Sequence, residues 1–217
     1  SRRQRQMCIR DSSYVKWDMN RHSCALGAKQ HEFILGLYDV LRRIFEPRPE
    51  VLLESCSSGG NRFDCGMLYF SPQIWCSDDT DAIERLAIQE GTALIYPLST
   101  IGAHVSDCPN HAVGRVTPFE TRGYVALAGT FGYELDVTRI PEEDRKQIPA
   151  QTAMYHKYND LVREGDYFRL ASASENQMYD SWQVVSKDGT ESLVTFIQVK
   201  GRTGQRSRRV FLRGLHP

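Results

Sequence analysis

The chain contains 217 residues, of which 27 are Lys or Arg and 27 are Asp or Glu, so its formal net charge is zero at pH 7. Apolar residues make up 41% of the chain, which excludes a collagen, a disulfide-stapled mini-protein and a disordered tail. No apolar run approaches the roughly 20 residues of a membrane span, and we see no signal-peptide pattern. The balanced charge argues against a dedicated nucleic-acid binder.

The zero net charge conceals an uneven distribution. Residues 1–12 carry a net charge of +3 and residues 200–213 carry +6, so residues 13–199 carry −9. A solvated tail or strand edge is the favoured interpretation of each basic end, ahead of a phosphate-binding patch.

None of the six cysteines forms a CxxC pair, and no secretion signal accompanies them. We therefore predict free thiols and a cytoplasmic protein. The six are Cys8, Cys24, Cys56, Cys65, Cys76 and Cys108.

Residues 1–12 have no hydrophobic periodicity, and we expect a disordered or artefactual leader there. Beyond it, short apolar runs alternate with helical patterns, which predicts parallel β/α units with chemistry at the carboxyl ends of the strands. The predicted strands are 14–19, 51–55, 73–77, 93–98 and 131–137. The predicted helices are 31–45, 81–91 with Thr80 as its cap, 118–130, and 141–165 interrupted at Pro149.

After residue 165 the pattern changes to period-two alternation with turn signals such as Asp188-Gly189. The alternating segments are 167–172, 177–189, 190–200 and 208–215. They predict an antiparallel β domain over residues 166–217, separate from an α/β domain over residues 13–165.

Carboxylates follow two of the predicted parallel strands. Asp18 ends the first, and Asp78, Asp79 and Asp81 follow the third. Two carboxyl groups across a pocket can hydrolyse a glycosidic bond, one as nucleophile or base and the other as acid. Acidic residues at strand ends also bind Mg²⁺, and residues 79–81 can simply cap the following helix.

Three neighbouring side chains fit a sugar site. Lys16 projects to the same side of its strand as Asp18, where a cation would keep the carboxylate ionised. Trp17 and Trp75 offer flat apolar faces for a pyranose ring.

Other motifs carry weaker signals. His104, Cys108 and His111 have a spacing that could suggest zinc, but no fourth ligand is evident. Cys56 could be a nucleophilic thiol, although a pocket-lining role is favoured because no His stands in a partner motif. The glycine-rich turn at 57–61 lacks the ending of a phosphate-binding loop.

The segments KWDMNR (16–21) and ESCSSGGNRFDCGMLYFSPQIWCSDDTDAIERL (54–86) closely resemble the bacterial α-galactosidases of glycoside hydrolase family 36. The later stretches YPLSTIGAHVSDCPNH and GRVTPFETRGYVALAGTFGYELD match as well. The resemblance implies a (β/α)₈ barrel, an N-terminal β-supersandwich and a C-terminal antiparallel β domain. It also implies a retaining mechanism without a cofactor or metal.

Carried over residue by residue, the resemblance implies that Asp18 is the nucleophile and Asp78 the general acid/base. The Lys and Asn of KWDMN, here Lys16 and Asn20, bind galactose hydroxyls in the family. The family's Cys and first Gly of ESCxxGG line the pocket, which implies the same for Cys56 and Gly59.

The chain also departs from the family, whose members run to several hundred residues. It enters at the fourth barrel strand, so we expect about strands 4–8 of a TIM barrel followed by a truncated β domain. The isolated fragment is expected to be inactive.

The parent is expected to be a homo-oligomeric exo-α-galactosidase that cleaves terminal α-1,6-galactose from melibiose or raffinose. It is expected to bind neither nucleic acid nor a membrane. The alternatives are α-N-acetylgalactosaminidase, raffinose-type galactosyl transfer and an inactive carbohydrate-binding module.

Overall fold

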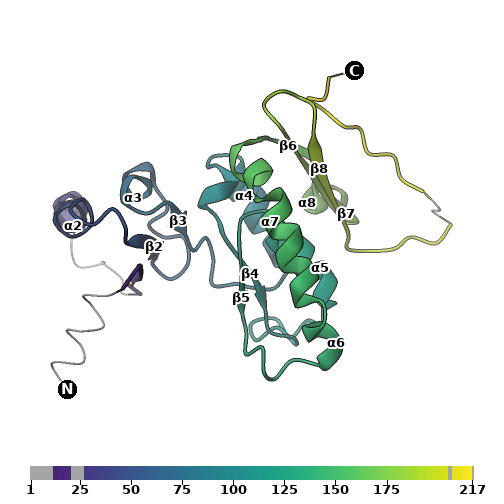
Figure 1. Ribbon diagram of the computed structural model, residues 1–217, viewed down its shortest axis with the longest axis horizontal. Coiled ribbons are helices and arrows are strands. Elements are labelled where there is room, and N and C mark those ends of the chain that lie inside the picture. Colours follow the sequence, from purple (N-terminus) through teal and green to yellow (C-terminus); the bar gives the residue numbers. More distant parts are fainter. Residues whose placement is uncertain (1–11, 21–26, 205–206, 217) are drawn as a thin grey trace. The chain divides into compact units, whose positions relative to one another are not determined.

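The computed structural model describes residues 12–20, 27–204 and 207–216. The chain divides into two compact units, Ser1–Asp78 and Asp79–Pro217 (Figure 1). All but one residue of the expected leader, and also Cys8 and Cys24, lie outside the described residues.

The first unit is built on a parallel three-stranded sheet in the order β1-β2-β3. The strands are β1 (Tyr14–Asp18), β2 (Leu52–Cys56) and the short β3 (Gln73–Ile74). They alternate with the 3₁₀ turn η1 (Gly27–Lys29), α2 (Gln30–Phe45) and α3 (Cys65–Phe70). The three predicted strands and the predicted helix at 31–45 are therefore present.

The core of this unit lies between α2, α3 and the sheet. Its buried residues are Leu41, Phe45, Leu53, Met67 and Ile74. Trp17 packs against this cluster, which favours a role in packing over its interpretation as a sugar-stacking residue. Trp17 lies one position from Lys16 and Asp18 on β1, and alternation along a strand places it on the opposite face.

The second unit begins with parallel β/α structure. Strands β4 (Gly102–Ser106) and β5 (Thr130–Glu134) pair in parallel, and α5 (Phe119–Ala126) packs on β4. Helices α4 (Glu84–Ala93), α6 (Glu142–Arg145) and α7 (Ile148–Glu164) and the turn η2 (Leu98–Thr100) complete it. The core here contains Val105, Phe119, Ala126 and Ile140.

The predicted strand at 93–98 is wrong. Helix α4 extends to Ala93, and the apolar side chains that follow it are exposed, Leu94 at 62% and Ile95 at 76%. The strand lies further on, in β4, whose Gly102, Ala103 and His104 do not read as an apolar run. Parallel pairing with β5, rather than local hydrophobicity, selects the segment that is buried.

The cap predicted for α4 is also wrong. Asp81, not Thr80, accepts hydrogen bonds from the backbone N–H groups of Ile83 (3.0 Å) and Glu84 (3.1 Å). The Thr80 hydroxyl oxygen instead accepts from the Asn110 amide at 3.1 Å. Asp81 is buried and forms an ion pair with Arg115, so a structural role accounts for it fully.

An antiparallel sheet in the order β6-β7-β8 ends the fold. Its strands are β6 (Asp166–Ala171), β7 (Tyr179–Val185) and β8 (Ser192–Gln198), with the short α8 (Ala173–Asn176) after β6. The predicted turn at Asp188-Gly189 joins β7 to β8, and Gly189 has a positive φ of 68°. The sheet packs against α7 and α5 of the same unit, and α4 contacts α8.

The predicted strand at 208–215 is not formed in the described part of the chain. The backbone N–H of Arg213 donates to the side chain of Gln183 at 2.9 Å, and that of His216 donates to Gly189 at 3.0 Å. These single contacts do not make a ladder, because alternation alone cannot form a strand without a partner edge.

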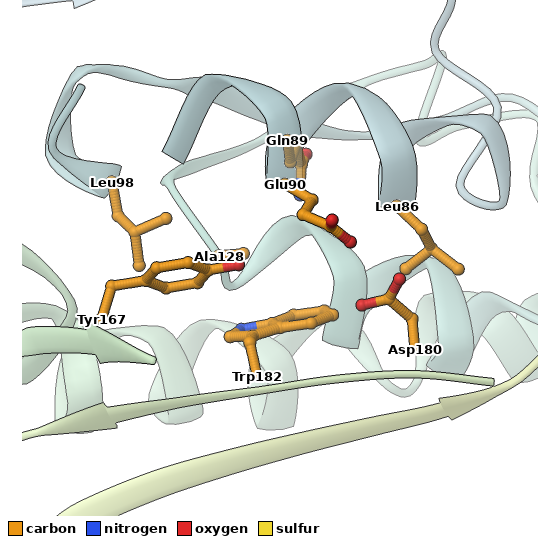
Figure 2. A pocket seen from close by; sticks show the side chains of 8 residues that line it. All are labelled: Leu86, Gln89, Glu90, Leu98, Ala128, Tyr167, Asp180 and Trp182. Atoms are coloured by element: carbon orange, nitrogen blue, oxygen red, sulfur yellow. The ribbon is translucent and has the colours of Figure 1, made fainter. Parts of the chain in front are cut away.

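Figure 2 shows where α4 meets the antiparallel sheet. Glu90 from α4 and Asp180 from β7 point into the same small pocket, which is floored by the ring of Trp182. Arg169 on β6 forms ion pairs with Glu90 and with Glu175 of α8, both at 3.0 Å.

The sequence predicts neither a membrane span nor disulfide bonds. Among the described residues, no helix is long and apolar enough to cross a membrane. The four cysteines within the described ranges, at positions 56, 65, 76 and 108, form no disulfide.

Candidate active site

The carboxylates singled out in the sequence lie at the carboxyl end of the first unit's parallel sheet. Asp18 is the last residue of β1 and pairs in register with Cys56, the last residue of β2. Asp78 follows the end of β3 by four residues. Parallel strands bring these ends to one edge, where β/α folds place their chemistry.

Asn20 connects Asp18 to the turn after β2. Its Nδ2 donates to Asp18 Oδ2 at 2.9 Å. Its Oδ1 accepts from the Ser58 backbone N–H at 2.7 Å and from the Ser58 hydroxyl at 3.2 Å. The amide therefore has one orientation in this network, and it holds the Asp18 carboxylate against the turn.

The glycine-rich turn packs closely on the segment that carries Asp78. Gly59 has a φ of +78°, and a Cβ built on it would lie 2.9 Å from Ser77 Cα and 3.1 Å from the Asp78 nitrogen. Only glycine accepts both this backbone conformation and this approach. Gly59 thus has a structural role in the site that the sequence motif did not reveal.

Cys56 is buried next to Asp18. Burial is the largest cause that raises the pKa of its thiol, and the hydrogen bond and charge of Asp18 raise it further. A raised pKa disfavours the thiolate, which is the nucleophilic form. The alternative of a nucleophilic Cys56 is therefore not supported.

Lys16 has a different partner from the one expected. Its Nζ lies 3.3 Å from Oε1 of Glu54 and 4.8 Å from the centre of the Trp75 ring. Glu54, which is 2% exposed, pairs in register with Lys16 on β2. Glu54 was missed in the sequence, although its place two residues before Cys56 puts both on one face of the strand.

Trp75 connects Lys16 to the second carboxylate. Its Nε1 donates to Asp78 Oδ1 at 3.1 Å, so the ring contacts a cation on one side and anchors Asp78 through its edge. Trp75 is 4% exposed. It therefore organises the site from within rather than presenting an open stacking face.

The neighbouring aspartates belong to the start of α4. Asp79 Oδ1 accepts from the Asp81 backbone N–H at 3.0 Å, and Asp81 caps the helix as described above. Capping thus accounts for Asp81, in keeping with the competing interpretation of this cluster.

Arg62 is a further residue that the sequence did not single out. It follows the glycine-rich turn, is 7% exposed, and donates to the main-chain carbonyl groups of Cys56 and Trp17. A buried arginine between a turn and a helix gives no local sequence signal, since the same GNRFD segment could equally expose it.

The described residues contain no group of three or more His, Cys, Asp or Glu side chains that could hold a metal ion. The Cys108 thiol contacts the Thr117 carbonyl oxygen at 3.7 Å. His104 and His111 belong to β4 and to the loop after it.

A parallel β/α scaffold with a pair of aspartates at the carboxyl ends of its strands is characteristic of many glycoside hydrolases. The Melibiase family matches residues 6–165, and the glycosyl hydrolase family 36 C-terminal domain matches residues 179–217. The chain belongs to the Melibiase family, and the resemblance to glycoside hydrolase family 36 is confirmed. The match begins inside the segment expected to lie outside the family.

The chain is similar to several curated α-galactosidases. It is 48% identical over 206 residues to the bifunctional α-galactosidase/sucrose kinase AgaSK of Mediterraneibacter gnavus, covering 94% of this chain and 22% of that protein. It is 46% identical over 213 residues to α-galactosidase AgaA of Geobacillus stearothermophilus, covering 94% and 29%. The chain thus spans less than a third of the length of these relatives.

Solved structures show the same similarity. The galactosidase domain of AgaSK superposes with a TM-score of 0.91 at 46% identity, covering 98% of this chain and 30% of that one. AgaA superposes with a TM-score of 0.87, covering 94% and 30%. Substituted forms of AgaA have been solved in complex with raffinose and with stachyose.

Proposed function

We propose that the full-length protein containing this chain is a retaining exo-α-galactosidase that removes terminal α-1,6-linked galactose from melibiose- and raffinose-type oligosaccharides. The observation that carries the proposal is the network from Asp18 through Asn20 to the turn that packs on Asp78. The α-galactosidase relatives and the oligosaccharides bound to AgaA support the substrate class.

The proposed reaction is a double displacement. An oxygen of the Asp18 carboxylate attacks the anomeric carbon while the bond to the leaving oxygen breaks, and Asp78 gives its proton to that oxygen. Water then attacks the anomeric carbon, the ester bond to Asp18 breaks, and Asp78 takes the proton from water. Galactose leaves with its original anomeric configuration, and both aspartates return to their starting states.

The remaining predicted residues have binding roles in this proposal. Lys16 and Asn20 hold galactose hydroxyls, and Cys56 and Gly59 line the pocket. The ion pair with buried Glu54 supports the binding role of Lys16, because it restricts the long lysine side chain to a position beside the strand end. The raised pKa of Cys56 supports a neutral, pocket-lining thiol.

The finer description of the fold is also a proposal. Residues 13–165 correspond to about strands 4–8 of a (β/α)₈ barrel, and residues 166–217 to the start of the C-terminal β domain. The β/α alternation up to α7 and the antiparallel sheet that begins at Asp166 support this division. Homo-oligomer formation and a cytoplasmic location remain predictions for the parent.

The other candidate functions have less support. An α-N-acetylgalactosaminidase and a galactosyl transferase share the two-carboxylate chemistry, but curated relatives with 42–48% identity to this chain are named α-galactosidases. A non-catalytic binding module would have no need of both Asp18 and Asp78.

Covalent trapping tests the proposed function. A slow fluorinated galactoside should add one sugar to Asp18 of the full-length protein, detected by mass spectrometry of the peptide. Asp18→Asn should abolish turnover of an aryl α-galactoside, while the control Asp79→Asn should keep most of it. Absence of the adduct, or faster turnover of the corresponding N-acetylgalactosaminide, would contradict the proposal.

A further inference from the structure

Arg62 is a buried cation at the end of the sheet that carries the nucleophile. It lies between the glycine-rich turn and α3, whose first turn is capped by Asp64 through a 2.8 Å hydrogen bond from the Met67 N–H. Only 7% of Arg62 is exposed. Burying a guanidinium costs free energy unless its N–H groups find acceptors and its charge lies near an opposite charge. The groups around Arg62 therefore indicate its role.

The hydrogen bonds of Arg62 join the ends of two strands. Its Nη2 donates to the carbonyl oxygen of Cys56, and more weakly to that of Trp17 at 3.5 Å. The Trp17 carbonyl belongs to the peptide bond that leads into Asp18, and Cys56 is the register partner of Asp18. One side chain therefore links the backbone just before the candidate nucleophile to the end of the neighbouring strand.

These hydrogen bonds satisfy only one of the three guanidinium nitrogens of Arg62. Its Nε and Nη1 are buried and have no hydrogen-bond partner among the described residues. Burial is the largest influence and lowers the pKa of the guanidinium, and the charge of Asp18 is the first of those that raise it. The hydrogen bonds of Arg62 to the Trp17 and Cys56 carbonyls place its charge beside the strand end that carries Asp18, whereas Lys16 forms its ion pair with Glu54.

We propose that Arg62 is a positioning residue that acts through Asp18 and promotes the second half of the reaction, the hydrolysis of the galactosyl ester. The inference rests on the proposed function. In the first step the negative charge on Asp18 decreases as the ester forms, so a cation behind it gives no acceleration. In the second step Asp18 departs as a carboxylate, and the growing negative charge is stabilised by the fixed guanidinium.

Replacing Arg62 should make hydrolysis of the galactosyl ester the rate-limiting step. With an activated aryl α-galactoside, Arg62→Met in the full-length protein should slow ester hydrolysis roughly tenfold or more. Because the first step is spared, kcat and KM should fall together and kcat/KM should change less than about threefold. A burst of aryl alcohol should precede the steady state, with an amplitude near one equivalent.

Conservative and matched variants separate charge from structure. Arg62→Lys keeps the charge and should restore ester hydrolysis at least in part. Arg122→Met removes another buried arginine that donates to a strand-end carbonyl, that of Ser106. It should lower the melting temperature without producing a burst.

The outcomes distinguish this inference from the proposed function. If the unsubstituted protein forms no adduct on Asp18, the proposed function fails. If the adduct forms but Arg62→Met shows no burst, or loses kcat/KM as much as kcat, the role of Arg62 is wrong. Should Arg62→Met not fold, Arg62→Gln decides in the same way, since it is neutral but keeps a donor for the Cys56 carbonyl.

Discussion

At the scale of single residues, the candidate site depends on both local and cross-strand side-chain partners. Asp18 and Lys16 are neighbours on one face of β1, yet each contacts a different residue, Asn20 for Asp18 and Glu54 for Lys16. Their types and spacing are readable from the sequence. The pairing of Lys16 with Glu54 is not, because the register of β1 against β2 decides which residues of the two strands meet.

Gly59 provides a test at this scale. Gly59→Ala should destabilise the full-length protein by about 1–3 kcal/mol, because the added methyl meets backbone at 2.9 Å and the positive φ strains any Cβ. It should also reduce kcat/KM, since the turn and the Asp78 segment must separate. Urea unfolding and aryl α-galactoside kinetics measure the two effects.

Gly91 is the matched control for that substitution. It lies in α4, and a Cβ built on it has no heavy atom within 4 Å. Gly91→Ala should therefore stabilise the protein by about 0.5–1 kcal/mol. Equal effects of the two substitutions would show that the close approach at Gly59 is unimportant.

At the scale of elements, the helix α4 and the antiparallel sheet meet through ionisable groups. Asp180 on β7 is 3% exposed and accepts a 3.0 Å hydrogen bond from the Ala173 N–H. Glu90 and Tyr167 line the same pocket from α4 and β6 (Figure 2), and Arg169 forms an ion pair with Glu90. Burial, and then the charge of Glu90, raise the pKa of Asp180 to about 6, against the backbone hydrogen bond and Arg169.

This raised pKa predicts a pH-dependent stability. Between about pH 4 and pH 6 the folded protein holds the Asp180 proton that the unfolded chain has lost, so stability decreases as pH rises through this range. Asp180→Asn removes that decrease and keeps the acceptor for Ala173. The free energy of unfolding of the variant, minus that of the unsubstituted protein, should increase by on the order of 1–2 kcal/mol between pH 4 and pH 7.

Asp188 supplies a control of opposite sign. Hydrogen bonds from Ser186 and Thr190 lower its pKa to about 2, so its contribution is present above about pH 4 and is lost as pH falls toward 2. Asp188→Asn should therefore lose stability at neutral pH. Urea midpoints at pH 4 and pH 7 measure the effect of Asp180→Asn, and midpoints at about pH 2 and pH 4 measure that of Asp188→Asn. A common pH slope for Asp180→Asn and the unsubstituted protein would contradict the prediction.

The two incorrect strand predictions also belong to this scale. The run 93–98 is apolar but has no strand beside it, and the run 208–215 alternates but pairs with nothing within the described residues. A strand requires a neighbouring edge, which a local pattern cannot report. Helices α2, α5 and α7 were easier to predict, because their hydrogen bonds are internal to each segment.

At the scale of the whole molecule, the first unit leaves apolar surface uncovered. Helix α2 buries Leu41 and Phe45, but the side chains of Phe33, Leu35, Val40 and Ile44 on it are between 37% and 53% exposed. Strand β1 lies at the edge of its sheet as described, with Tyr14 at 45% exposure. Edges and apolar faces of this kind favour association.

We therefore expect the isolated 217-residue chain to aggregate, or to require the rest of the parent protein in order to fold. It should also lack α-galactosidase activity. Light scattering with denaturant unfolding tests the first expectation, and turnover of an aryl α-galactoside tests the second. A monomer with one cooperative transition, or activity that Asp18→Ala abolishes, would contradict them.

The sequence by itself determined the class of the fold, the position of most helices and strands, and the family, and it supplied the residues proposed for the candidate site. These features depend on local periodicity and on motifs that are contiguous in the chain. Only the tertiary structure decided that Trp17 packs against the core of the first unit, that Glu54 holds Lys16, and that Arg62 forms hydrogen bonds to the backbone beside Asp18. Each of these depends on contacts between distant segments, because burial and charge compensation arise only when strands and turns are assembled.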